Sequence, residues 1–132
     1  MIFMTLTIYS RDLLVIGNQD FPENNLTIQE IRAIFLDKKR FIQEEKILVM
    51  NYAFQDPLRQ CFEKNILEKR ERTLERYWRR AYYFGKRPPK IVSSVEMLFS
   101  YLQRVHPSIG YCDSNVIENR KVRILYRIGC DF

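Results

Sequence analysis

Arginine and aromatic side chains are interleaved along residues 73–89, TLERYWRRAYYFGKRPP, and this stretch holds most of the side chains that could bind a ligand. It contains the only tryptophan, Trp78, and three of the eight tyrosines. Arginine pairs with anions, and aromatic rings stack on the bases of single-stranded nucleic acids. The stretch could therefore bind nucleic acid, an acidic protein or a small anion. The cations of this basic surface are Arg76, Arg79, Arg80, Lys86 and Arg87.

The same stretch also has the pattern of an amphipathic helix that packs on a core. At helical spacing its apolar side chains share one broad face, which comprises Leu74, Tyr77, Trp78, Ala81 and either Tyr82 or Phe84. Gly85 is suited to the left-handed C-terminal cap, and the two prolines that follow prevent the helix from resuming. On this interpretation Trp78 is a structural core residue and the arginines form a solvated face.

The remaining residue types indicate no enzymatic chemistry. His106 is the sole histidine and precedes Pro107 at an expected helix end, which favours a capping or surface role over catalysis. No Ser/His/Asp or Cys/His grouping, no metal-ligand spacing and no glycine-rich phosphate loop is present in the sequence. We therefore expect no catalytic residue, no metal and no cofactor.

The three cysteines, Cys61, Cys112 and Cys130, form no CxxC pair, which argues against a structural zinc site. Their odd number makes a disulfide framework an unfavoured interpretation, and at most one bridge can form within a monomer. Cys61 lies among apolar residues of an expected helix and is most simply a small buried hydrophobic side chain.

The net charge of +6 is concentrated in one part of the chain. Residues 64–90 carry ten Lys or Arg against three Glu, so the rest of the chain is close to neutral. A length of 132 residues suits one domain with a real core. Residues 1–11 are either the remnant of a signal sequence or an N-terminal strand, and residues 12–132 are expected to form the domain. No stretch is long and apolar enough for a transmembrane helix.

The order of expected elements is β-α-β-β-α-α-α-β-β, which favours an α/β layer packing with a mixed sheet flanked by helices. Residues 12–17 are predicted to form a buried strand, residues 41–51 two short strands, and residues 121–128 a half-exposed or edge strand. Three helices have clear starts: a capping box of Thr27 with Glu30, an Asp56-Pro57 pair, and a second capping box of Ser93 with Glu96.

Four segments, in order, resemble the phosphate-type substrate-binding proteins of ABC transporters. LTIQEIRAIFLDKKRF (residues 26–41) resembles their LT-x-x-E-L-x-x-I-F-x-G-K segment, with Asp37 in place of the glycine. RQCF (residues 59–62) resembles their R-x-x-F, and residues 77–98 resemble W-x-x-x-x-F-x-G-x-x-x-P-x-x-V-x-S-x-x-E-M. HPSIGYCD (residues 106–113) resembles x-P-G-A-I-G-Y-V. The resemblance covers roughly residues 12–128.

This resemblance implies one lobe of a type 2 periplasmic-binding-protein-like fold in a periplasmic or otherwise extracytoplasmic location. The family binds its anion between two lobes, and the chain has about half of the family's length. It also implies a ligand site near Gln55, Asp56 and Arg59.

The anion loop departs from the family pattern. The family has Gly-Ser-Gly-Thr before R-x-x-F, where small residues let N–H and O–H donors surround an oxyanion. Here Gln55, Asp56, Pro57 and Leu58 occupy those positions. Proline removes a donor, leucine removes a hydroxyl, and Asp56 adds a negative charge. We therefore expect free phosphate not to bind at residues 53–58.

Three functional hypotheses follow. The first is a non-enzymatic extracytoplasmic binding or interaction module whose partner is another protein, such as an envelope or transport component. The second is a binder of small anions that uses Arg59 and nearby arginines. The third is a basic nucleic-acid-binding domain, which an extracytoplasmic location would exclude.

Overall fold

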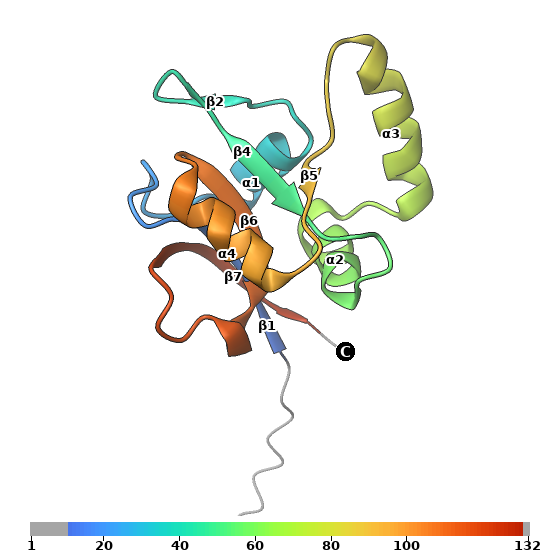
Figure 1. Ribbon diagram of the computed structural model, residues 1–132. Helices are drawn as coiled ribbons and strands as arrows, with labels where there is room; N and C mark the ends of the chain where they lie inside the picture. Colours follow the sequence, from blue (N-terminus) through green and yellow to red (C-terminus); the bar gives the residue numbers. More distant parts are fainter. Residues whose placement is uncertain (1–10, 131–132) are drawn as a thin grey trace, which may run out of the picture.

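A five-stranded mixed sheet with the strand order β5-β4-β6-β1-β7 forms the centre of the protein. The computed structural model describes residues 11–130 and is shown in Figure 1. β1 runs antiparallel to both β6 and β7, whereas β4 runs parallel to β6 and β5. A separate two-stranded hairpin pairs β2 with β3. The strands are β1 (Arg11–Asn18), β2 (Phe41–Ile42), β3 (Glu45–Lys46), β4 (Leu48–Asn51), β5 (Lys90–Ile91), β6 (Ser108–Asp113) and β7 (Val122–Cys130).

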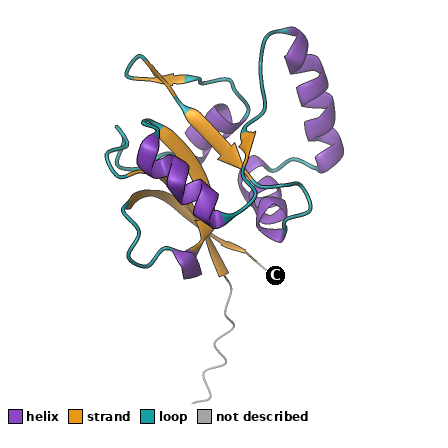
Figure 2. Cartoon of the chain, in the orientation of Figure 1, coloured by secondary structure: helices purple, strands orange, loops and turns teal. Residues whose placement is uncertain are grey.

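Helices cover both faces of this sheet, as Figure 2 shows for α4 and α1. Gly110 of β6 faces α4, where an added Cβ would lie 2.5 Å from Leu98 Cδ1. The next residue, Tyr111, points to the opposite face and stacks on Phe62 of α2 with 4.2 Å between ring centroids. The α-helices are α1 (Ile28–Phe35), α2 (Pro57–Phe62), α3 (Glu71–Tyr83) and α4 (Val95–Arg104); α2 continues as a π-helical turn (Glu63–Leu67), and a 3-10 turn spans Ser114–Val116.

The central position of β1 in the sheet explains why the sequence of this strand is a continuous apolar run. Leu13, Leu14, Val15 and Ile16 are all fully buried, because the strand has neighbours on both edges and helices on both faces. The strand expected at residues 12–17 is confirmed, and so is the α/β class with a mixed sheet between helices. The expected edge strand at residues 121–128 is also confirmed, because β7 closes one end of the strand order.

Two of the three predicted helix starts are confirmed. Thr27 and Glu30 form the complete capping box of α1, and Asp56 with Pro57 begins α2. The third prediction was wrong by one residue. Ser94 is the N-cap of α4, and its Oγ accepts the backbone N–H of Met97. The Oγ of Ser93 instead contacts the sulfur of Met97.

The interpretation of Cys61 as a simple buried hydrophobic residue was incomplete. Cys61 is buried, but it forms a disulfide with Cys130, 69 residues away, with 5.8 Å between the two Cα atoms. The bond joins α2 to the end of the edge strand β7. Sequence spacing gave no sign of this pair, because their proximity depends on the sheet topology. Cys112 is buried in β6 as a free thiol.

The two alternatives for the N-terminus, a signal remnant or a strand, fall almost wholly on residues 1–10, which lie outside the described residues. Arg11, the last residue of that predicted segment, is the first residue of β1. Within residues 11–130 no helix has both the length and the apolar character needed to cross a bilayer.

Candidate binding site

A small crevice lies where the parallel strands β4 and β5 end and the helices α2 and α4 begin. In open α/β sheets this edge is the usual place for a ligand, because helix N-termini direct N–H groups toward it. The crevice has a volume of about 250 Å³. Its lining residues come from both helix starts, from β1 and from the end of β6: Arg11, Tyr52, Asp56, Pro57, Leu58, Ser93, Ser94, Val95, Asp113 and Val116.

The N-terminus of α2 is occupied by a side chain of the protein itself. Asp56 Oδ1 accepts the backbone N–H of Leu58 at 2.9 Å, and Pro57 contributes no N–H group. At α4 the Oγ of Ser94 accepts the N–H of Met97 at 3.1 Å. An anion at either helix start would need backbone N–H groups as hydrogen-bond donors. At each of the two starts, one of these N–H groups is already bonded to a side chain of the protein.

The charges around the crevice are mixed. Asp56 and Asp113 bring two carboxylates, and Arg11 lies 3.5 Å from Asp113 as an ion pair. Sequence reasoning missed Arg11 and Asp113. These residues are 102 positions apart and meet only because β1 pairs with β6, so no local pattern could have revealed them.

Arg59 lies outside this crevice. Its Nε donates to Glu63 Oε2 at 2.9 Å and its Nη1 donates to the Tyr52 carbonyl at 2.8 Å. The guanidinium is therefore held by the chain, with about a fifth of the side chain exposed. Gln55 is exposed and lines neither the crevice nor the groove described below. Of the three predicted ligand residues, the structure places only Asp56 in the crevice.

A buried polar cluster holds the end of β4 in place. Asn51 Oδ1 accepts the backbone N–H of Tyr52 at 2.8 Å and also the hydroxyl of Tyr111. The Tyr52 hydroxyl donates to the Tyr111 carbonyl at 2.7 Å. Burial raises the pKa of both phenols well above their ordinary values, so both are neutral donors. This cluster fixes the loop that leads into α2.

A larger groove, about 880 Å³ in volume, runs between α3 and the body of the protein. Its lining is mostly apolar and aromatic, with Arg59 paired to Glu63 and with Glu71 and Glu75 on α3. Carboxylates outnumber cations along it. The lining residues are Phe35, Leu36, Asn51, Phe54, Arg59, Glu63, Leu67, Glu71, Leu74, Glu75, Trp78, Arg79, Tyr82, Tyr83, Pro88, Pro89 and Ile91.

The apolar face predicted for α3 is only partly in the core. Leu74 and Ala81 are buried, but Tyr77 and Trp78 are half-buried, and the rings pack edge to face at 5.0 Å. The Tyr77 hydroxyl donates to the Leu36 carbonyl at 2.6 Å, and burial raises its pKa. The expectation that Trp78 is a core residue was therefore too strong, because one side of its ring lines the groove. Tyr82 and Phe84, the alternative ends of the apolar face, are both exposed.

The predicted basic surface divides into two parts. Arg76, Arg79 and Arg80 are exposed along α3, and Arg79 also lines the groove. Lys86 and Arg87 lie beyond the helix end and are tied to the loop after α1. Lys86 Nζ donates to the Asp37 carbonyl at 3.2 Å, and the N–H of Arg87 donates to Asp37 Oδ2 at 2.9 Å.

His106 contacts a backbone carbonyl and a carboxylate. Its Nε2 lies 3.1 Å from the Gln103 carbonyl and its Nδ1 lies 3.6 Å from Asp20 Oδ1, at the exposed end of α4. Among the described residues no three His, Cys, Asp or Glu side chains are grouped to hold a metal ion.

The protein is similar to known proteins in its fold. No protein-family model and no curated protein matches the sequence. A phosphate ABC transporter substrate-binding protein with bound phosphate from Clostridium perfringens matches with a TM-score of 0.70 and 17% identity over 87% of this chain and 44% of that chain. PstS from Borrelia burgdorferi matches with a TM-score of 0.69 and 17% identity, over 87% of this chain and 46% of that chain.

An ABC-type phosphate transport receptor from Vibrio cholerae gives a TM-score of 0.68 at 15% identity, over 87% of this chain and 45% of the receptor. The chain thus spans less than half the length of each of these proteins. The resemblance stated from the sequence motifs is confirmed for the fold. The protein has the mixed α/β architecture that phosphate ABC transporter substrate-binding proteins use, in a single small unit.

Proposed function

We propose that the protein is a non-enzymatic extracytoplasmic binding module that acts through contact with another protein and does not bind free phosphate. The observation that carries the proposal is the carboxylate of Asp56, which caps α2 at the position where a phosphate would need the helix N-terminus. An anion placed there would face a negative charge and compete with an internal hydrogen bond.

The state of Arg59 supports the same conclusion. Its guanidinium is paired with Glu63 and bonded to a backbone carbonyl, so an incoming anion would have to displace Glu63. Breaking a half-buried ion pair leaves a carboxylate without its partner, which is costly. The alternative of a small-anion binder that uses Arg59 and nearby arginines would therefore depend on the exposed Arg79 and Arg80, which do not line the crevice.

The disulfide supports the extracytoplasmic location. A bond such as Cys61–Cys130 is typical of an oxidising compartment, because cytosolic thiols are kept reduced in most organisms. The solved structures with this fold are phosphate transport proteins, which agrees with this location.

The groove beside α3 is the surface that best suits a protein segment. It offers aromatic and proline side chains for apolar contact, together with Glu71 and Glu75 as acceptors at one end. We propose that it takes a partner segment with apolar and basic side chains, because opposite charges across an interface favour the encounter.

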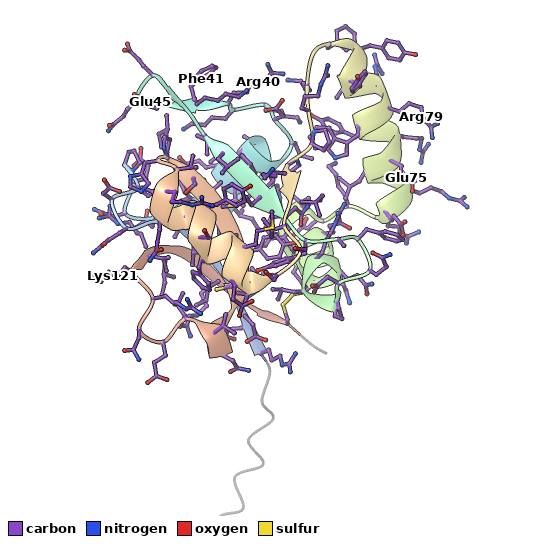
Figure 3. All side chains as sticks on the ribbon, viewed as in Figure 1. Arg40, Phe41, Glu45, Glu75, Arg79 and Lys121 are labelled. Atoms are coloured by element: carbon purple, nitrogen blue, oxygen red, sulfur yellow. A yellow bond between two sulfur atoms is a disulfide. The ribbon has the colours of Figure 1, made fainter. Side chains whose placement is uncertain are left out.

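Site-specific photocrosslinking in the native cell tests this proposal. A photoreactive residue in place of Glu75, which lines the groove, should give one discrete protein adduct. The same residue in place of Lys121 should give none, because Lys121 lies on the opposite side of the molecule (Figure 3). No adduct from position 75, or equal adducts from both positions, would contradict the proposed use of the groove.

A further inference from the structure

Two basic stretches that are far apart in the sequence meet at one end of the molecule. The loop after α1 carries Lys38, Lys39 and Arg40, and the end of α3 with the loop after it carries Arg80, Lys86 and Arg87. Arg40 Nη2 donates to the Gly85 carbonyl at 2.7 Å, which joins the two stretches directly. We call residues 38–41 and 80–87 together the basic end.

Asp37 stabilises the contact between the two basic stretches. Its backbone adopts φ 58, in the left-handed region that favours glycine, and the family motif has glycine at this position. The aspartate uses its carboxylate there: Oδ2 accepts the N–H of Arg87 at 2.9 Å and pairs with Arg40 at 3.0 Å. The basic end is therefore a defined structure and not merely a run of surface charges.

Exposed aromatic rings stand among these cations. Tyr83 is 87% exposed, Phe84 is 74% exposed and Tyr82 is 58% exposed, and Phe41 from the other stretch is 54% exposed. These four account for more than half of the large hydrophobic side chains that are exposed within residues 11–130. Figure 3 shows Arg40 and Phe41 at the same end of the molecule as the C-terminal end of α3. Exposing apolar side chains of this size to water costs free energy, which a contact with another molecule would recover.

We propose that the basic end is a docking surface for an anionic lipid bilayer. The basic end brings six cations and four exposed aromatic rings together. Asp37 is already paired with Arg40, and Glu45 lies on the hairpin that carries Phe41. Anionic headgroups attract such a cluster of Lys and Arg, and Phe and Tyr side chains are suited to the interface between headgroups and acyl chains. The surface would hold the protein against the membrane.

The shape and chemistry of the basic end favour a bilayer over a nucleic acid. A single-stranded nucleic acid is usually held in a cationic groove whose aromatic rings stack on successive bases. Here the cations of the basic end lie outside the groove beside α3, whose carboxylates outnumber its cations, and of the four exposed rings only Tyr82 and Tyr83 line that groove. Arg87 already stacks on Tyr82, with 3.9 Å from its guanidinium carbon to the ring centroid.

This inference does not rest on the proposed function, because the cations of the basic end lie outside the groove, although Tyr82 and Tyr83 belong to both surfaces. The part of the groove beside Glu71 and Glu75 would be free to contact a protein while the basic end lies on the membrane. Failure of the groove crosslink would leave the membrane inference standing, and failure of lipid binding would leave the groove untouched.

Vesicle co-sedimentation of the full chain with its disulfide intact tests the proposal. The vesicles are phosphatidylcholine alone or phosphatidylcholine with about a third phosphatidylglycerol, at low and high salt. We expect at least about tenfold tighter binding to the anionic vesicles at low salt, and a steep loss at high salt. Equal binding to both vesicle types, or no binding to either, would overturn the proposal.

Matched variants separate the basic end from the general positive charge. Tyr83→Ser with Phe84→Ser should weaken binding about tenfold, and Lys38→Gln with Arg80→Gln should do the same. Two controls should bind as the unaltered protein does: Lys64→Gln with Lys121→Gln, which removes the same charge elsewhere, and Ile124→Ser, which removes an exposed apolar side chain from β7.

All these residues are exposed, so the variants should keep the melting temperature of the parent, and any that does not is replaced by its single substitutions. Loss of binding in the controls equal to that in the basic-end variants would overturn the proposal. A thymidine oligonucleotide that binds more tightly than the vesicles and loses affinity in Tyr83→Ser with Phe84→Ser would show a nucleic-acid surface instead.

Discussion

The carboxylate of Asp56 accepts the backbone N–H of Leu58 at 2.9 Å, so the N-terminus of α2 is capped by the chain itself. In an anion site the same N–H groups would point at the ligand. A single side chain therefore both stabilises the helix and opposes the ligand chemistry associated with this fold. The two roles can be separated by substitution.

Replacing Asp56 with alanine should lower the free energy of unfolding by about 1 kcal/mol, because the cap hydrogen bond is lost. Asp56→Asn is the matched control and should be close to neutral, since asparagine caps helices as well as aspartate does. Urea denaturation measures both. Equal loss in the two variants would mean that the charge of Asp56, and not its cap bond, is what stabilises α2.

Local patterns in the sequence were enough to predict most elements. The capping box of Thr27 and Glu30, the Asp56-Pro57 start of α2 and the apolar run of β1 are signals within a few residues, and the structure confirms each. The N-cap of α4 was misplaced because two serines are adjacent, and either can cap a helix. The start of α3 at Glu71, inside the charged segment before Thr73, carries no capping side chain that could have revealed it.

Pairings between residues far apart in the chain could not be predicted from the sequence. Cys61 with Cys130 and Arg11 with Asp113 depend on strand order, which no local pattern encodes. Arg59 lies away from the crevice because it pairs with Glu63, one helical turn further along. The i,i+4 spacing that allows this pair is visible in the sequence. The groove beside α3 was not predicted either. The helical spacing of Trp78 in the sequence is the same whether its side chain is half-buried or fully buried.

Loss of the disulfide should destabilise the fold markedly. The bond closes a loop of 69 residues, for which the chain-entropy model gives roughly 4 kcal/mol. Cys61→Ala with Cys130→Ala should therefore lower the free energy of unfolding by about 3–5 kcal/mol. Adding a reductant should destabilise the parent but leave this double variant unchanged. A parent whose unfolding curve is the same with and without reductant would show that the bond does not form.

The free thiol of Cys112 should be inert in the native protein. Burial, with the nearby charge of Asp113, raises the pKa of Cys112 to about 12, whereas an exposed thiol has a pKa of about 8.5. Iodoacetamide at about pH 8 should therefore label Cys112 only after denaturation. Mass spectrometry of the native and unfolded protein reads the labelling, and rapid native labelling would contradict the burial of this side chain.

The same shift makes stability fall at alkaline pH. The native state keeps the proton of Cys112 while the unfolded state loses it, so the stabilising contribution is complete below about pH 8.5 and declines as the pH rises toward 12. Cys112→Ala should flatten the decline between about pH 8 and 9, below the range in which the tyrosines titrate. A slope that is unchanged in this variant would assign the decline to other groups.

Trp78 should contribute less to stability than a fully buried tryptophan would. Trp78 is half-buried and lines the groove, so Trp78→Ala should cost about 1–3 kcal/mol and not the roughly 3–5 kcal/mol typical of a core position. Leu74→Ala is the comparison, because Leu74 is 5% exposed on the same helix. Thermal and urea unfolding measure both. A cost for Trp78→Ala above that for Leu74→Ala would place the indole ring in the core.

Calorimetric titration of the full chain with inorganic phosphate at moderate ionic strength tests the central claim most directly. Asp56 caps α2 and Arg59 is paired with Glu63, so we expect no measurable binding at millimolar phosphate. Asp56→Ser removes the opposing charge while keeping a capping hydroxyl, and any weak binding should appear first in that variant. Micromolar or tighter binding by the unaltered protein, abolished in Arg59→Ala, would contradict the account.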